Sequence, residues 1–173
     1  RPEAKDPNRK ISDEVALSIR NLAVDMPGEQ VYDVNLDVYE GEILGIAGLA
    51  GQGKLGIANG ILGTYPATGS VEFHGKPLPL GNTKKILGSK IAFVSEDRRG
   101  VGLLLEEPIY WNISFNAMQV QDKFIKRVLG MRFRDEAEMK RVSDAYIESL
   151  AIRTTGSHQK AGNLSGGNQQ KVC

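Results

Sequence analysis

The sequence lacks most of the features that would assign it to a membrane, a secreted scaffold or a nucleic acid. Of its 173 residues only Cys173 is a cysteine, which excludes an internal disulfide and is typical of a reducing compartment. No apolar run approaches the roughly 18 residues that a membrane-spanning helix requires. The formal net charge is only +1, so no strong field favours nucleic acid or an acidic membrane.

The composition that is present is that of an ordinary globular domain. Hydrophobic residues make up 40% and charged residues 25% of the chain, which is long enough for one domain with a core. Residues 1–14 contain two prolines and many charges, and they lack the apolar stretch of a signal peptide. We therefore predict a linker or frayed terminus over 1–14 and a folded domain over 15–173.

Strand patterns dominate the first part of the chain. Residues 15–24 and 31–39 alternate apolar and polar side chains, which predicts two antiparallel strands with one solvated face. Residues 43–47 (ILGIA) and 91–94 (IAFV) are apolar without alternation, as in fully buried strands. A further short strand is expected over 70–73.

Helical spacing dominates the second part. Apolar residues recur at helical intervals over 54–62 and again between about 134 and 151, and we expect residues 108–120 to be helical as well. The helix before residue 151 carries one apolar face, formed by Met139, Val142, Tyr146, Ile147 and Leu150. A loop is expected over 154–163, so the pattern as a whole predicts an α/β fold.

A glycine-rich segment, residues 48–54 (GLAGQGK), matches the phosphate-loop pattern GxxxxGK. Glycines let successive N–H groups turn toward phosphate oxygens, and the following helix directs its positive end at the same anion. The alternative is a strand–helix turn that binds nothing, and the strand and helix on either side argue against it. The predicted nucleotide-binding residues are Gly48, Gly51, Gln52, Gly53, Lys54, Leu55 and Gly56.

Leu55 departs from this pattern. A phosphate loop usually has Ser or Thr after the lysine, because its hydroxyl holds Mg²⁺. A leucine side chain cannot ligate a hard cation, which requires oxygen. We therefore expect phosphate binding to survive and metal-assisted hydrolysis to suffer.

A second motif occupies residues 164–172 (LSGGNQQKV). Ser165 is expected to cap the helix that follows, and its hydroxyl and the glycine N–H groups can bind a γ-phosphate. A Ser-Gly-Gly sequence by itself would indicate only a helix cap, but the full motif in order after a phosphate loop favours phosphate recognition.

The two motifs together resemble the nucleotide-binding domain of ABC transporters, and LSGGNQQKV resembles the ABC signature in the longer form of simple-sugar importers. The resemblance implies a P-loop NTPase fold with an antiparallel β subdomain and an inserted helical subdomain, here over about 100–163. It also implies that two such domains close head to tail. The residues that would then contact ATP on the partner domain are Leu164, Ser165, Gly166, Gly167, Asn168 and Gln169.

Residues 91–99 (IAFVSEDRR) resemble the Q-loop of this family. The second domain of sugar importers often has V-x-E-D-R here, so the chain is identified as a second, C-terminal nucleotide-binding domain. Glu96 stands where most ABC domains have glutamine. It is a possible Mg²⁺ ligand, although its charge repels triphosphate unless Mg²⁺, Arg98 or Arg99 offsets it. The alternative is a solvated charged turn.

Other family features are absent from the sequence. No Walker B strand ending in Asp-Glu follows residue 53, and no switch histidine is recognisable, so we expect a domain incomplete at its C-terminus and without catalytic residues. By itself it should not turn over ATP. Residues 22–28 contain no aromatic residue to stack on adenine, which predicts weak base discrimination.

The resemblance implies an ATP-binding subunit, an ATPase when intact, that uses ATP and Mg²⁺ to drive import of a simple sugar or related solute. Its partners would be a second nucleotide-binding domain, transmembrane permease subunits and, indirectly, a solute-binding protein, with no nucleic acid. It would lie peripherally on the cytoplasmic face of the cell membrane.

Two alternatives remain. The first is a degenerate regulatory half that binds ATP, completes the partner site and does not hydrolyse, as Leu55 suggests. The second is an ABC-type ATPase of DNA repair. The short span of residues 100–163, its lack of cysteine and the near-zero charge argue against this second alternative.

Overall fold

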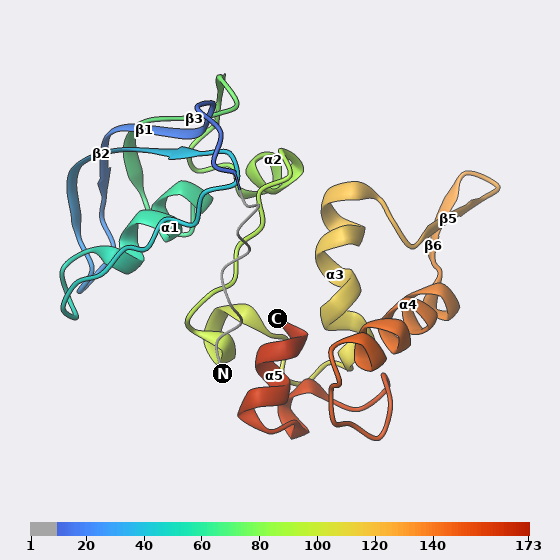
Figure 1. Cartoon of the computed structure of the whole chain (residues 1–173). Coiled ribbons are helices and arrows are strands. Elements are labelled where there is room, and N and C mark those ends of the chain that lie inside the picture. The colour runs from blue at the N-terminus through green and yellow to red at the C-terminus, as the bar shows by residue number, and fades with distance from the viewer. Residues whose placement is uncertain (1–9) are drawn as a thin grey trace. The chain divides into compact units, whose positions relative to one another are not determined.

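The computed structural model describes residues 10–173, which fall into two compact units that meet in sequence at Ile91 and Ala92 (Figure 1). The predicted linker over 1–14 therefore lies mostly outside the described residues. None of the described helices combines the length and apolar character needed to cross a membrane.

The first unit is built on a four-stranded antiparallel sheet in the order β2-β1-β3-β4. Strands β1 (Val15–Val24) and β2 (Val31–Tyr39) confirm the two predicted strands and their antiparallel pairing. β3 (Ala67–Phe73) begins three residues before the predicted 70–73 and pairs with the other side of β1, and β4 (Lys76–Pro77) closes the edge.

Helix α1 (Lys54–Leu62) covers one face of this sheet, as Figure 1 shows, and confirms the predicted helix over 54–62. The register of β1 shifts between Ile19 and Leu22, so Ile19, Leu22 and Val24 all enter a buried core with Val71 and Ile61. A short helix α2 (Thr83–Gly88) follows and was not predicted. It buries only Ile86.

The two predicted buried strands are wrong. Residues 43–47 and 91–94 pair with no strand among the described residues, and Ile43 is 78% and Val94 67% exposed. An apolar segment becomes a strand only where a neighbour satisfies its N–H and C=O groups. The described part of the chain supplies no such neighbour for either segment.

The second unit is mainly helical. Helices α3 (Ile109–Gln121), α4 (Glu136–Ser149) and α5 (Gly166–Val172) confirm the predicted helices within a few residues. A π-helical turn, Arg98–Gly102, and a 3₁₀ turn, Ala161–Asn163, lie in the connecting segments.

The core of this unit joins its turns and helices. It consists of the buried side chains of Leu103, Ile109, Ile152, Leu164 and Val172. The predicted apolar face of α4 is only partly buried. Met139 is fully covered, but Tyr146 and Leu150 are about half exposed. The apolar stripe is thus wider than the surface that neighbouring elements cover.

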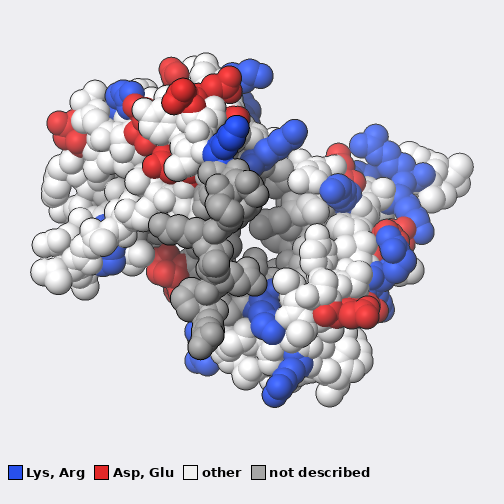
Figure 2. All heavy atoms as spheres, in the orientation of Figure 1, with Lys and Arg blue, Asp and Glu red and all other residues white. Residues whose placement is uncertain are grey.

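A two-stranded hairpin, β5 (Ile125–Val128) and β6 (Met131–Arg134), was not predicted. Its tip is apolar and its sides are basic, and Figure 2 shows the Lys and Arg side chains gathered there. Acidic neighbours pair with these cations, for example Asp135 with Lys126 at 2.8 Å and Asp122 with Arg132. These ion pairs neutralise part of the positive charge of the hairpin.

Candidate phosphate-binding site

The glycine-rich loop of residues 48–53 leads directly into α1. Gly51 and Gly53 have φ angles of 81° and 83°, in the left-handed region that glycine adopts without strain. A Cβ atom on Gly53 would lie 2.5 Å from the carbonyl oxygen of Gln30. The loop thus requires glycine twice, once for its conformation and once for the close approach of the β1–β2 turn.

The side chains of the loop fold back onto its backbone. Lys54 donates from Nζ to the carbonyl oxygen of Leu49 at 2.8 Å, and the N–H of Leu49 donates to Oε1 of Gln52 at 3.3 Å. Lys54 Nζ also lies 3.9 Å from Oε1 of Glu29. The predicted lysine and glutamine therefore lie at the loop.

Glu29 is a residue of this site that the sequence analysis missed. Its side chain is buried and accepts a hydrogen bond at 2.8 Å from the N–H of Gly51, and the N–H of Leu55 lies at 3.5 Å from the other carboxylate oxygen. The Gly51 hydrogen bond, more than the Leu55 N–H and the Lys54 charge, holds the pKa of Glu29 below its ordinary value. The loop therefore already gathers its N–H groups around an anion.

The hydroxyl that holds Mg²⁺ in most phosphate loops is missing here. Leu55 offers only hydrocarbon where a hydroxyl is usual, and no cluster of His, Cys, Asp and Glu suited to a metal occurs among residues 10–173. The loop therefore fits a phosphate anion, whereas the residues around it do not by themselves fit Mg²⁺.

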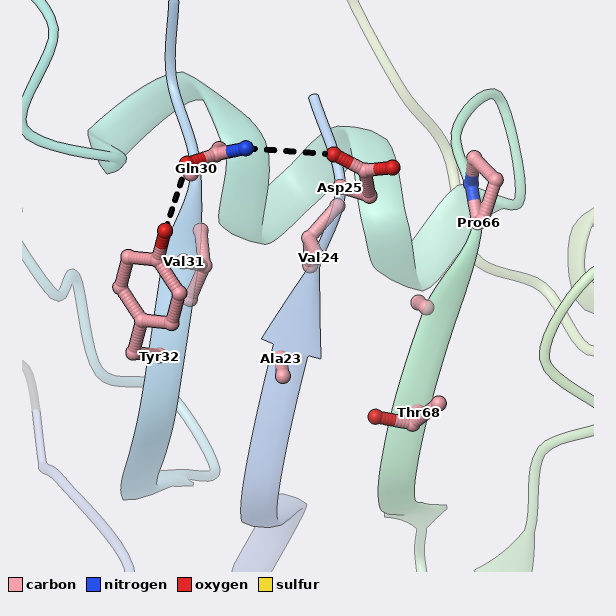
Figure 3. A pocket seen from close by; sticks show the side chains of 9 residues that line it. Ala23, Val24, Asp25, Gln30, Val31, Tyr32, Pro66 and Thr68 are labelled. Carbon is pink, nitrogen blue, oxygen red and sulfur yellow. Dashed lines mark hydrogen bonds between the residues drawn. The ribbon is translucent and has the colours of Figure 1, made fainter. Parts of the chain in front are cut away.

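A pocket of about 310 Å³ lies at one end of the sheet, where β1 ends and where β2 and β3 begin (Figure 3). Tyr32 stands at its rim and is 75% exposed, and its hydroxyl donates to Oε1 of Gln30 at 2.5 Å. Gln30 in turn donates to Asp25 at 3.3 Å, and its carbonyl faces Gly53 of the loop. The full lining is Ala23, Val24, Asp25, Gln30, Val31, Tyr32, Pro66, Ala67 and Thr68.

Tyr32 is an aromatic residue near the end of β1, where the sequence analysis expected none. That expectation considered only residues 22–28, at the end of the first strand, and this aromatic residue lies on the next strand. A pairing of the two strands across their turn would have placed Tyr32 beside that end, so the signal was present in the predicted hairpin.

The signature segment lies in the second unit, at the start of α5. Ser165 occupies the N-cap position, but its hydroxyl accepts from Nδ2 of Asn168 at 3.0 Å and makes no hydrogen bond to a helix N–H. The predicted side-chain cap is therefore wrong, because the Ser165 hydroxyl accepts from the Asn168 side chain and not from a helix N–H. Asn168 also accepts from the N–H of Arg153 at 3.0 Å, which ties the motif to the preceding loop.

The remaining signature residues divide by exposure. Leu164 and Gln169 are buried, and Gln169 donates from Nε2 to the carbonyl oxygen of Ala161 at 3.2 Å. Their side chains hold the loop and are not available to a ligand in this arrangement. Gly166 and Gly167 are exposed, and Arg98 donates to the Gly166 carbonyl at 2.5 Å.

Glu96 is exposed beside a structured turn. Asp97 caps this turn by accepting from the N–H of Gly100 at 2.9 Å, and its own N–H donates to Ser95 Oγ at 3.2 Å. The turn is thus more ordered than a solvated charged loop. The predicted metal role of Glu96 remains a prediction.

The order of the elements, a strand pair, a phosphate loop with its helix, a helical unit and a signature helix, is that of an ATP-binding cassette. A model of the ABC transporter family matches residues 31–173, and the chain belongs to this family. A solved structure described as an ATP-binding cassette of an ABC transporter superposes with a TM-score of 0.60 at 22% identity. It covers 93% of this chain, and this chain covers 63% of it. The predicted fold class is confirmed.

The chain is also similar to import ATP-binding proteins of bacteria. The chain is 39% identical over 165 residues to the "Putative ribose/galactose/methyl galactoside import ATP-binding protein 3" of Burkholderia cenocepacia. It is 36% identical over 164 residues to the xylose import ATP-binding protein of Moorella thermoacetica. The matches cover 93% and 91% of this chain, but it spans only 30% and 31% of the relatives' lengths.

Proposed function

We propose that the protein is an ATP-binding subunit that couples ATP binding and hydrolysis to the import of a simple sugar. The relatives are named as import ATP-binding proteins, and the family match covers most of the chain. The observation that carries the proposal is the phosphate loop, whose N–H groups at Gly51 and Leu55 already face an anion. The names of the relatives give no support to a degenerate regulatory half.

The proposal assigns a part to each motif. The loop and Lys54 hold the phosphates of ATP, with the charge of Lys54 directed at the β and γ phosphates. The pocket at the end of the sheet receives the base, and Tyr32 offers its ring for stacking. The exposed residues Ser165, Gly166 and Gly167 of the signature, with the partly buried Asn168, serve the nucleotide of a second nucleotide-binding domain.

The proposed partners follow from this arrangement. The subunit works with a second nucleotide-binding domain and with transmembrane permease subunits, and it acts indirectly with a solute-binding protein. It lies peripherally on the cytoplasmic face of the membrane. Hydrolysis uses Mg²⁺ in the intact protein, while the described residues by themselves bind nucleotide without turning it over.

Calorimetric titration of the chain with ATP tests the proposal. We expect saturable binding, and we expect Lys54→Ala to weaken it about tenfold or more, since a charged phosphate contact is removed. Lys76→Ala, an exposed lysine on β4, is the matched control and should leave the affinity unchanged. ATP binding that is indifferent to Lys54, or no binding at all, contradicts the proposal.

A further inference from the structure

We propose that Glu29 is an internal anion that occupies the phosphate loop and must leave it before a phosphate can bind. This inference rests on the proposed function, since it concerns the same loop. It adds a gate to the site, because a carboxylate of the same chain takes the N–H groups that a phosphate would use.

The contacts of Glu29 are those that a phosphate-binding loop offers to phosphate. One carboxylate oxygen takes the Gly51 N–H at 2.8 Å and lies 3.9 Å from Lys54 Nζ. The other lies 3.5 Å from the N–H of Leu55, in the first turn of α1. Loop amide, helix N-terminus and lysine are thus all turned toward one side chain.

Phosphate and this carboxylate cannot share these donors. Each N–H makes one good hydrogen bond, and two anions in contact repel each other. Glu29 is only 8% exposed. A phosphate group that reaches the Gly51 and Leu55 amides therefore displaces the carboxylate.

Only the side chain of Glu29 needs to move. Its backbone is fixed, because its N–H donates to the carbonyl of Met26 at 2.9 Å and its carbonyl oxygen lies where a Cβ on Gly56 would come within 2.3 Å. A glutamate side chain has three rotatable bonds and can swing to solvent from a fixed backbone. The gate thus opens without unfolding the β1–β2 turn.

A purely structural role predicts the opposite outcome. If Glu29 only ties the β1–β2 turn to the start of α1, its removal loosens the loop and weakens phosphate binding. If Glu29 competes with phosphate, its removal strengthens binding. Glu29→Gln keeps the shape and removes the charge, so it separates the two.

The experiment compares the affinity of wild type, Glu29→Gln and Lys54→Ala for inorganic pyrophosphate and for ATP. Glu72→Gln, an exposed glutamate on β3, is the matched control. We expect Glu29→Gln to bind pyrophosphate roughly tenfold more tightly than wild type, with Glu72→Gln unchanged. If Glu29→Gln is too unstable to measure, Glu29→Asp, which is one carbon shorter and reaches the loop poorly, should tighten binding in the same direction.

A second measurement detects the contact without a nucleotide. The amide resonance of Gly51 should shift as the carboxyl of Glu29, whose charged neighbour is Lys54, titrates. This pH response should disappear in Glu29→Gln and on saturation with pyrophosphate.

The failures are distinguishable. Binding that depends on Lys54 but is equal or weaker in Glu29→Gln overturns the gate and leaves the proposed function standing. A Gly51 amide indifferent to the titration also overturns the gate. Absence of pyrophosphate and ATP binding in every variant, Glu29→Gln included, overturns both.

Discussion

At the level of single residues, the phosphate loop couples anion recognition to the pH response of the fold. The Gly51 N–H first, and then the Leu55 N–H and the charge of Lys54, lower the pKa of Glu29 below its ordinary 4.5. A carboxyl with a lower pKa in the folded than in the unfolded chain stabilises the fold above the unfolded value, and this contribution is lost as pH falls through the folded value.

Glu29→Gln should therefore flatten the acid limb of the stability profile. We expect the melting temperature of wild type to fall more steeply than that of Glu29→Gln as pH decreases from about 4.5. Thermal unfolding followed by circular dichroism between pH 7 and pH 3 measures this. The variant should keep part of the slope, because the pKa values of Asp37 and Asp135 are also lowered, mainly by Arg20 and Lys126. Parallel profiles would contradict the prediction.

Tyr32 is the residue that we expect to distinguish adenine nucleotides from bare polyphosphate. Loss of ring stacking contributes about 0.5–1.5 kcal/mol, so Tyr32→Ala should weaken ATP binding about 2- to 10-fold. Inorganic tripolyphosphate has no base, and its affinity should not change. Tyr39→Ala, at the far end of β2, is the control. Equal weakening of ATP and tripolyphosphate binding would instead indicate that Tyr32 supports the loop.

At the level of elements, the contact between α1 and β1 shows how closely the helix that carries the phosphate loop packs on the sheet. A Cβ atom built on Gly60 would lie 2.3 Å from a methyl carbon of Val24. Gly60→Ala should therefore destabilise the first unit by about 1–3 kcal/mol through overpacking, despite the better helix propensity of alanine. Urea denaturation measures the change. Gly45→Ala has no neighbour within 4 Å and should be near neutral.

The elements predicted from sequence were those whose pattern is local. Alternation predicted β1 and β2, and helical spacing predicted α1, because each element is stabilised by neighbours close in sequence. The strands expected over 43–47 and 91–94 failed because an apolar run specifies burial but not the partner that provides it. The β5–β6 hairpin was missed because its residues after Ile125 are all exposed, so burial imposes no alternation on them.

The glycines and the lysine of the candidate site could be predicted from the sequence motif. Side chains that reach the site from elsewhere in the sequence could not. The motif located the loop and Lys54, but Glu29 lies more than 20 residues from Gly51 and is brought there by the β1–β2 turn. Asn168 likewise displaces the expected Ser165 cap through a side-chain bond that no motif encodes. Spacing predicts backbone geometry, whereas side-chain partners depend on the folded turn.

For the whole molecule, we expect ATP binding to depend little on Mg²⁺. Leu55 provides no oxygen where the family motif has a hydroxyl, so ATP should bind this chain with nearly the same affinity with and without Mg²⁺. Leu55→Thr should introduce a clear Mg²⁺ dependence, because its hydroxyl can join the metal bound to the phosphates. Calorimetry of both proteins in magnesium and in a chelator measures this, with Leu55→Val as the control that shortens the side chain without adding oxygen. A strong Mg²⁺ requirement in the wild-type chain would contradict this prediction.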